Sequence, residues 1–498
     1  MSNRRSQPVA SGVLWAAASQ AGRLSIQFMV LAALSRLLPP QDFGLLALAT
    51  VVTSFAGLLR DMGTAAAIIQ REHLSARLLD AVFWFNILVG AGLALIVILL
   101  AVPIADLFRQ TRLAGVLTAL AICFPLASIG AVHQSLLERS LRFRSLARIE
   151  TSSGLLALVI AIVAAIHGLG VYSLVLNTIT TAAFTSLQLW FASKWRPKGR
   201  WSVNELRAIW KFSANLFGFQ TLNYFARNAD TMLIGRFLGA TDVGWYNMSY
   251  RIMLFPLTNL SGVISRVLFP MLSRRQTDTA LFGALYLKLT SALAVVIVPL
   301  MIELWVLRKP FVDVVLGKRW WPVAEVLAWL APVGMVQSVF TTVGLIYMAT
   351  GNTRLMMRWG LFAGVMIVTA MAIGLRWGYL GVAKSYAVVT FLLLYPLLAV
   401  PLKLVGLKII DVIRSVRLQV ITATIMAIVL SLLEKTLSVE MEPLLRLIVL
   451  MTIGVLTYLA TGYFVMRSTL MEVLAAIVPN NKLIGLRQPL NPRNENEK

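Results

Sequence analysis

Long apolar runs, separated by short charged or Pro- and Gly-containing stretches, follow one another along almost the whole chain. About 20 apolar residues are enough for a helix to cross the hydrocarbon core of a bilayer, and each run reaches about that length. We therefore predict an all-α polytopic membrane protein with about 14 transmembrane helices. The predicted spans are 12–38, 43–69, 81–104, 113–137, 151–167, 171–191, 209–238, 243–268, 285–307, 323–350, 359–375, 379–400, 416–433 and 444–466.

Composition and charge agree with this interpretation. Of the 498 residues, 58% are hydrophobic and 13% are charged, whereas a soluble domain has about 25% charged residues. This excludes a water-soluble globule. The net charge of +24 could indicate a nucleic-acid partner, but cations also collect in the cytoplasmic loops of membrane proteins. We favour the second explanation and expect no nucleic-acid partner.

The distribution of Lys and Arg predicts the orientation. If both termini are cytoplasmic, the inner loops and tail hold 26 of the 45 cations and the outer loops hold 11. Such an excess is the pattern of inner loops. The outer stretch from Arg308 to Trp321 is an exception. Its segment Lys318–Pro322 contains Trp320 and Trp321, and we expect it to lie at the headgroup level of the membrane.

An internal repeat divides the chain. Residues 34–44 align with residues 234–244, and Arg, Leu, Asp and Gly match in register. Weaker matches continue downstream at a slightly larger offset, as loop insertions would produce. The local alternative is that Asp42 and Asp242 cap helices and that Gly44 and Gly244 permit close packing. We predict two parallel six-helix repeats around a central cavity. The predicted units are an N-terminal lobe (1–200), a C-terminal lobe (201–401), and an extra helix pair with a cytoplasmic tail (402–498).

Ionisable residues inside the spans concentrate in the first two helices of each half. A charge at the centre of a membrane helix costs about 2.5–3.5 kcal/mol, so such groups usually face a bundle interior or a wet cavity. Three polar stripes with helical spacing predict one shared cavity. The charged residues are Arg23, Arg60, Asp61, Arg227, Asp230, Arg251 and Arg266, and the stripes are Gln20/Arg23/Gln27, Asn223/Arg227/Asp230 and Asn247/Arg251/Thr258.

The predicted cavity has a net positive charge, because the arginines outnumber Asp61 and Asp230. A cationic cavity suits an anionic ligand, above all a phosphate, which guanidinium groups bind through paired hydrogen bonds. The competing explanation is structural ion pairing. Arg227 and Asp230 lie one turn apart, and Arg60 and Asp61 could pair with neighbouring helices. Lys384 and Glu303 are interpreted as local structural features rather than ligand contacts. Arg266 is a candidate for one of the charges at the inner membrane edge that set the orientation of the protein.

The residues that enzyme chemistry requires are scarce. The sequence has no glycine-rich phosphate loop ending in Gly-Lys-Ser/Thr. Its single cysteine, Cys123, and its three dispersed histidines do not form a metal-binding pattern. We expect no catalytic residue, no metal and no cofactor, and we therefore predict that the protein is not an enzyme.

Three motifs resemble a known family. They are the segment 34–44, the segment Gln134–Arg144, and Gly317–Trp320 followed by Val323–Leu330. The chain resembles polysaccharide exporters, or Wzx-type lipid-linked oligosaccharide flippases, and is most similar to colanic-acid-exporter-like members. The same superfamily includes multidrug and toxin extrusion transporters and the lipid II flippase.

This resemblance implies a function. It is the translocation of an undecaprenyl-diphosphate-linked oligosaccharide repeat unit across the bacterial inner membrane, for exopolysaccharide or lipopolysaccharide biosynthesis. Two lobes would give alternating access to a cavity lined by helices 1, 2, 7 and 8. By position, the diphosphate would bind to Arg23, Arg60, Arg227 and Arg251, next to Asn223 and Asn247. The last helix pair would form a groove for the lipid tail, by analogy with the lipid II flippase.

The implied partners are the lipid-linked oligosaccharide, the membrane, and a polysaccharide polymerase with its chain-length regulator. We expect a monomer. Two alternatives stay open. One is an ion-coupled small-molecule exporter of the same fold, with Asp61 or Asp230 as ion-coupling residues, although a positive cavity disfavours cationic drugs. The other is a membrane-embedded polymerase or ligase.

Overall fold

The computed structural model describes residues 22, 26–61, 64–70, 74–199, 221, 223–273, 279–437 and 441–467. All regular secondary structure within these ranges is helical, as the apolar runs predict. Among the described residues, ten stretches are long and apolar enough to cross a membrane, and two of them, Thr111–Arg139 and Thr353–Leu404, each contain two α-helices. The predicted class, an all-α polytopic membrane protein, is confirmed.

The helices follow the predicted spans closely. They are Ile26–Leu37, α2 (Pro40–Asp61), α3 (Thr64–Gln70), α4 (Ala76–Leu107), α5 (Thr111–Ala121), α6 (Cys123–Arg139), α7 (Phe143–Ile166), α8 (Val171–Ala192), a helix at 223–237, α10 (Ala240–Ser273), α11 (Thr279–Val306), α12 (Arg308–Val315), α13 (Trp321–Ala349), α14 (Thr353–Gly374), α15 (Gly378–Leu404), α16 (Ile409–Thr436) and α17 (Pro443–Val465). The fourth predicted span is divided at Ile122 between α5 and α6.

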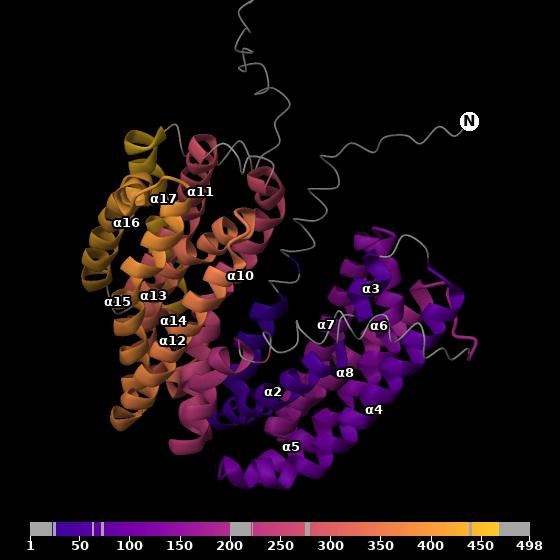
Figure 1. Cartoon of the computed structure of the whole chain (residues 1–498). Coiled ribbons are helices and arrows are strands. Elements are labelled where there is room, and N and C mark those ends of the chain that lie inside the picture. The colour runs from indigo at the N-terminus through magenta and orange to yellow at the C-terminus, as the bar shows by residue number, and fades with distance from the viewer. Residues whose placement is uncertain are drawn as a thin grey trace, which may run out of the picture.

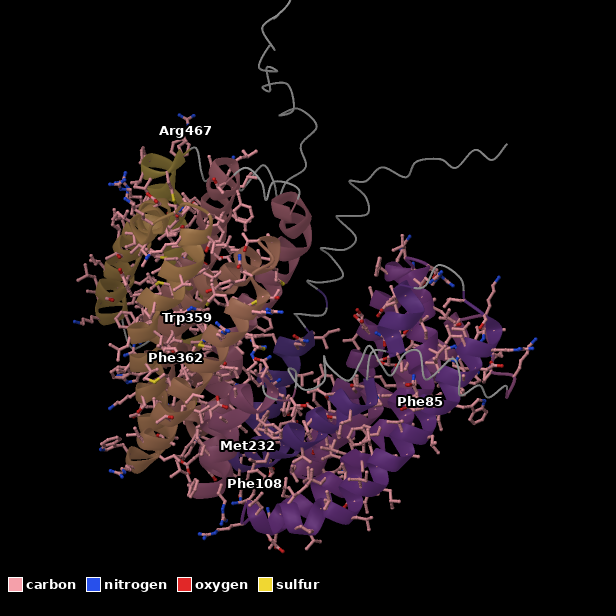
Figure 2. The ribbon with its side chains drawn as sticks, in the orientation of Figure 1. Phe85, Phe108, Met232, Trp359, Phe362 and Arg467 are labelled. Atoms are coloured by element: carbon pink, nitrogen blue, oxygen red, sulfur yellow. The ribbon has the colours of Figure 1, made fainter. Side chains whose placement is uncertain are left out.

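The helices form two groups that meet at one end (Figure 1). We use N lobe for the described helices up to α8, and C lobe for those from residue 223 to α15. The two groups spread apart towards the other end. Phe108 and Met232, one from each lobe, lie near the end where the lobes meet, and Arg467 lies at the opposite end (Figure 2). The predicted lobe boundary at residues 200 and 201 lies outside the described residues.

The two lobes touch where α2 and α10 begin, and we call this the junction end. A Cβ atom on Gly44 would lie 1.7 Å from the carbonyl oxygen of Ala240. A Cβ atom on Gly244 would lie 2.1 Å from the carbonyl oxygen of Pro40. Real Cβ atoms do not approach other heavy atoms so closely, so only glycine fits at either position. The contact is reciprocal and joins positions that differ by 200 residues, which is the offset of the sequence repeat.

A tryptophan of the C lobe strengthens the junction. Trp320 is fully buried, and its Nε1 donates to the carbonyl oxygen of Ser35 at 2.8 Å. Its ring meets Phe43 edge-on, with centroids 5.1 Å apart. Nearby, the Arg36 guanidinium donates to the carbonyl oxygen of Val314. Trp320 therefore packs inside the protein rather than against lipid, because the indole finds apolar neighbours and its hydrogen-bond acceptor in the N lobe.

The last helix pair, α16 and α17, packs mainly against α11 of the C lobe. The Gln419 side-chain amide on α16 lies 2.7 Å from Ser291 Oγ on α11. On α17, the Tyr458 hydroxyl donates to the carbonyl oxygen of Val295, also on α11, at 2.9 Å. Both bonds are buried or half-buried, so they stabilise the pair in a medium that offers the side chains few other polar partners.

The glycine contact yields a stability prediction. Gly44→Ala and Gly244→Ala should each lower the thermal unfolding temperature in detergent, because overpacking a tight contact costs about 1–3 kcal/mol. Gly57→Ala is the matched control on α2, since a Cβ atom there meets nothing within 4 Å and alanine favours the helix by about 0.5–1 kcal/mol. Unfolding of Gly44→Ala at or above the temperature of Gly57→Ala would contradict the packing.

Adjacent tryptophans provide a second prediction. Trp320→Ala should destabilise the protein by about 3–5 kcal/mol, the usual cost of truncating a buried aromatic side chain. Trp321→Ala should have little effect, because Trp321 is 51% exposed. Trp320→Phe should lie between the two, since it keeps much of the packing and loses the bond to Ser35. Equal unfolding temperatures for Trp320→Ala and Trp321→Ala would disprove that Trp320 strengthens the junction between the lobes.

Candidate functional site

A cavity of about 370 Å³ lies at the seam between the lobes, next to the junction end. Pockets that bind small ligands measure roughly 300–1,000 Å³, so this one can hold a small part of a large substrate. Five helices contribute to its walls, three from the N lobe and two from the C lobe. The lining residues are Val30, Leu31, Phe43, Leu46, Ala47, Thr50, Val51, Ser54, Leu174, Asn177, Thr178, Tyr224, Asn228, Gly244, Asn247, Met248 and Arg251.

The lining combines one cation with many uncharged hydrogen-bonding groups. Arg251 is the charged member of the lining set, and none of these residues is acidic. Hydroxyl and amide groups come from both lobes: Thr50, Ser54, Asn177, Thr178, Tyr224, Asn228 and Asn247. Such a lining can pair with a ligand that carries negative charge at one point and hydroxyl groups beside it.

One stripe of α10 crosses the cavity wall. Gly244, Asn247 and Arg251 are spaced by three and four residues, so they lie on one face of the helix. Gly244 brings this face against α2, as described above, and Arg251 is exposed to the cavity. The Asn247 Nδ2 donates to Thr231 Oγ1 over 3.4 Å, a long bond. The side-chain amide of Asn247 is therefore held only weakly.

Aromatic contacts close the seam beside the cavity. The Tyr224 hydroxyl donates to the carbonyl oxygen of Val51 across the lobes. The Phe55 ring on α2 lies 5.8 Å from the Tyr224 ring and 5.0 Å from that of Phe225, centroid to centroid. These contacts join α2 to the helix at 223–237. The cavity wall is thus made by the same helices that hold the lobes together.

The residues selected from sequence take different places. Asn247 and Arg251 line the cavity. Asn223 and Arg227 are exposed on the helix at 223–237 and are not among the lining residues. Arg60 is half-buried in the last turn of α2. Arg23 lies outside the described residues, as does the side chain of Asp61, the last residue of α2.

Asp230 is separated from the cavity lining and lies inside the C lobe. It is buried, and its Oδ1 accepts from the backbone nitrogen of Thr231 at 2.6 Å and from Thr231 Oγ1 at 3.3 Å. These two bonds come from Thr231, the neighbouring residue, and not from Arg227, which lies one turn away. A buried carboxyl in a transmembrane helix is costly, which makes Asp230 unusual for a purely structural position.

Several lining residues were not selected from sequence. Asn177 and Thr178 belong to α8, the sixth span, which the resemblance did not place at the cavity. Asn228 lies between the selected residues Arg227 and Asp230. The available signal was the polar spacing of span 6, where Asn177, Thr181 and Gln188 recur at helical intervals. Uncharged polar residues are common in transmembrane helices, so this signal is weaker than that of an arginine.

Comparison with known proteins identifies the family. Residues 33–325 match the model of a family described as polysaccharide biosynthesis protein. The chain belongs to this family. The match covers the N lobe from the end of its first helix, and the C lobe as far as the start of α13.

Curated relatives agree with this assignment. The chain is 28% identical over 382 residues to the lipopolysaccharide biosynthesis protein WzxC of Escherichia coli K12, covering 76% of this chain and 78% of that protein. It is 29% identical over 405 residues to the teichuronic acid biosynthesis protein TuaB of Bacillus subtilis, covering 80% and 83%. The resemblance to polysaccharide exporters is confirmed.

Solved structures share the fold. The lipid II flippase MurJ, in an inward closed conformation, matches with a TM-score of 0.72 at 16% identity over 92% of this chain and all of that one. An inward-facing multidrug resistance MATE transporter matches with a TM-score of 0.57 at 15% identity, over 81% of this chain and 99% of that one. At these identities the likeness concerns the architecture. The chain is a multi-pass membrane protein of the polysaccharide export family with a MurJ-like and MATE-like fold.

Proposed function

We propose that this protein is a flippase that moves an undecaprenyl-diphosphate-linked oligosaccharide repeat unit across the inner membrane for exopolysaccharide or lipopolysaccharide biosynthesis. The observation that carries the proposal is the seam cavity, with Arg251 as its cation and hydroxyl and amide groups around it. A diphosphate sugar has this same combination of charge and hydroxyl groups. The likeness to MurJ, a lipid II flippase with this fold, supports a lipid-linked substrate.

Arg251 is the described residue best placed to hold the diphosphate. A guanidinium donates two parallel hydrogen bonds to phosphate oxygens and keeps its charge in an apolar environment. Arg23, Arg60 and Arg227, with Asn223, remain proposed contacts to the same group as it passes through the protein. The lining residues include no carboxylate, which disfavours a cationic drug as substrate.

Transport would proceed by alternating access. The lobes touch at the junction end, where Arg36 and the segment Arg308–Val315 lie, and they spread apart at the other end. The proposed orientation, with both termini cytoplasmic, places the junction end on the outer side. The structure would then be an inward-facing state. Opening of the Gly44 and Gly244 contact would release the sugar on the outer side.

The remaining proposals concern partners and energy. A polysaccharide polymerase and its chain-length regulator would act on the translocated unit, and the flippase would work as a monomer. If an ion gradient drives transport, Asp61 and Asp230 are the proposed coupling residues. The burial of Asp230 supports its part, because a charged carboxylate inside the membrane is costly and gains from binding a proton or a sodium ion.

The arginine role predicts a loss of export. Arg23→Ala, Arg60→Ala and Arg251→Ala should each reduce export of the surface polysaccharide at least about tenfold, the cost of one lost charge-assisted contact. The amount of protein in the membrane should not change. Lys384→Ala is the matched control, because Lys384 is also an intramembrane cation but lies 5.6 Å from the ring of Trp329 on α13. Normal export in all three arginine variants would refute the role.

The coupling role predicts a change in energy dependence. In proteoliposomes, Asp230→Asn and Asp61→Asn should remove the stimulation of transport by a proton or sodium gradient, while substrate binding persists. Thr231→Val is a useful companion variant, since it removes one donor to Asp230 without removing the carboxyl. Transport by the unmodified protein that is insensitive to both gradients would eliminate this hypothesis.

A further inference from the structure

The sixth transmembrane helix of the N lobe, α8, enters the seam cavity with Leu174, Asn177 and Thr178. These residues are spaced by three and four positions and so lie on one face. The side chains of Asn177 and Thr178 are uncharged. They belong to the N lobe, whereas Arg251 belongs to the C lobe. The cavity therefore has a cationic side on α10 and an uncharged, hydrogen-bonding side on α8.

Asn177 has an unused donor. Its Nδ2 is buried and has no hydrogen-bond partner within the part of the chain that the structure describes. An unpaired amide in an apolar environment is costly, and the terminal torsion of asparagine turns easily. A ligand hydroxyl in the cavity can accept a hydrogen bond from this group.

Thr178 supplies a hydrogen-bond acceptor. Its hydroxyl donates to the carbonyl oxygen of Leu174 within the same helix, at 3.1 Å. Because the hydrogen is engaged there, the Thr178 oxygen is available as an acceptor. Asn177 thus presents a hydrogen-bond donor, and Thr178 presents an acceptor beside it. A sugar hydroxyl group can accept a hydrogen bond from the first and donate one to the second.

The C lobe adds two amides on the other wall. Asn228 Nδ2 donates to the carbonyl oxygen of Tyr224 in its own helix at 2.8 Å. Its side-chain oxygen is the atom with which it can accept from a ligand. Asn247 is held only by its 3.4 Å bond to Thr231. Asn247 also lies one turn from Arg251, so a hydroxyl bound to it would be close to a phosphate bound to Arg251.

Within the C lobe, aromatic rings fill the contact between α10 and α15. Tyr246 and Tyr250 stack with centroids 6.3 Å apart, and Tyr386 lies 6.4 Å from Tyr250. Gln337 donates to the Tyr386 hydroxyl. The described lining of the seam cavity accordingly includes residues of α8 and none of α15.

Building on the proposed function, we propose that Asn177 and Thr178 of the N lobe, with Asn228 and Asn247 of the C lobe, form a subsite for the hydroxyl groups of the sugar attached to the diphosphate. The bound sugar would bridge the two lobes. When the lobes separate at the seam, the sugar loses its contacts to one of them, which favours its release.

Binding of defined probes to the purified full-length protein tests this subsite. The probes are farnesyl diphosphate and the same molecule carrying glucose, galactose, N-acetylglucosamine or N-acetylgalactosamine. Asn177→Leu and Thr178→Val should weaken binding of at least one glycosylated probe about tenfold, the effect of losing one hydrogen bond of about 1.4 kcal/mol. Both variants should bind farnesyl diphosphate within about twofold of the unmodified protein, which also shows that they are folded.

Two variants complete the design. Thr181→Val is the matched control, because Thr181 also donates to its own helix, at 2.7 Å to the carbonyl oxygen of Asn177, but is not among the lining residues. It should bind every probe normally. Arg251→Gln should weaken binding of all the probes, since all carry the diphosphate.

The outcomes separate the two proposals. If no probe binds the unmodified protein, the proposed function is overturned together with the subsite. If the probes bind in an Arg251-dependent way but the sugar adds no affinity, the subsite is overturned and the proposed function stands. The same holds if Thr181→Val weakens glycosylated probes as much as Thr178→Val.

Discussion

The close approach of α2 and α10 is the contact on which the rest of the structure depends. Gly44 and Gly244 each face a carbonyl group of the opposite helix, at distances that leave no space for a side chain. In a membrane, helices gain little from the hydrophobic effect when they associate, so small residues that permit backbone contact decide where they meet. The junction end is built at this contact, and Trp320 packs beside it through Phe43 and Ser35.

The cavity follows from the same contact. Gly244 lies on the stripe of α10 that continues to Asn247 and Arg251, and α2 supplies the facing wall. Because the helices that touch at the junction also line the cavity, movement of the lobes must change the junction and the cavity together. This would provide the mechanical link that the proposed alternating access requires, since a closed junction and an occupied cavity depend on the same pair of helices.

The cavity also divides its chemistry between the lobes. Arg251 belongs to the C lobe, whereas Asn177 and Thr178 belong to the N lobe. A cation in a low-dielectric environment contributes affinity for any diphosphate, and neutral hydroxyl and amide groups discriminate among sugars. The C lobe would then supply the affinity for the diphosphate, and both lobes would contribute to selectivity for the sugar. The buried Asp230 is not among the cavity-lining residues and lies inside the C lobe. An ion bound there would therefore act on the packing of that lobe.

The helices themselves were predictable from sequence. The length of an apolar run and the charges at its ends are local properties, and they decide whether a segment spans a bilayer and in which direction. The repeated Arg, Leu, Asp and Gly of residues 34–44 and 234–244, and the arginines of the family resemblance, were accessible in the same way. Tertiary structure alone decided which face of each helix meets the other lobe. It brought Asn247 and Arg251 into the cavity, left Arg227 exposed, added Asn177 and Thr178 from α8, and buried Trp320. The physical reason is that the rotation of a membrane helix about its axis depends on close packing with its neighbours, and these neighbours come from distant parts of the chain.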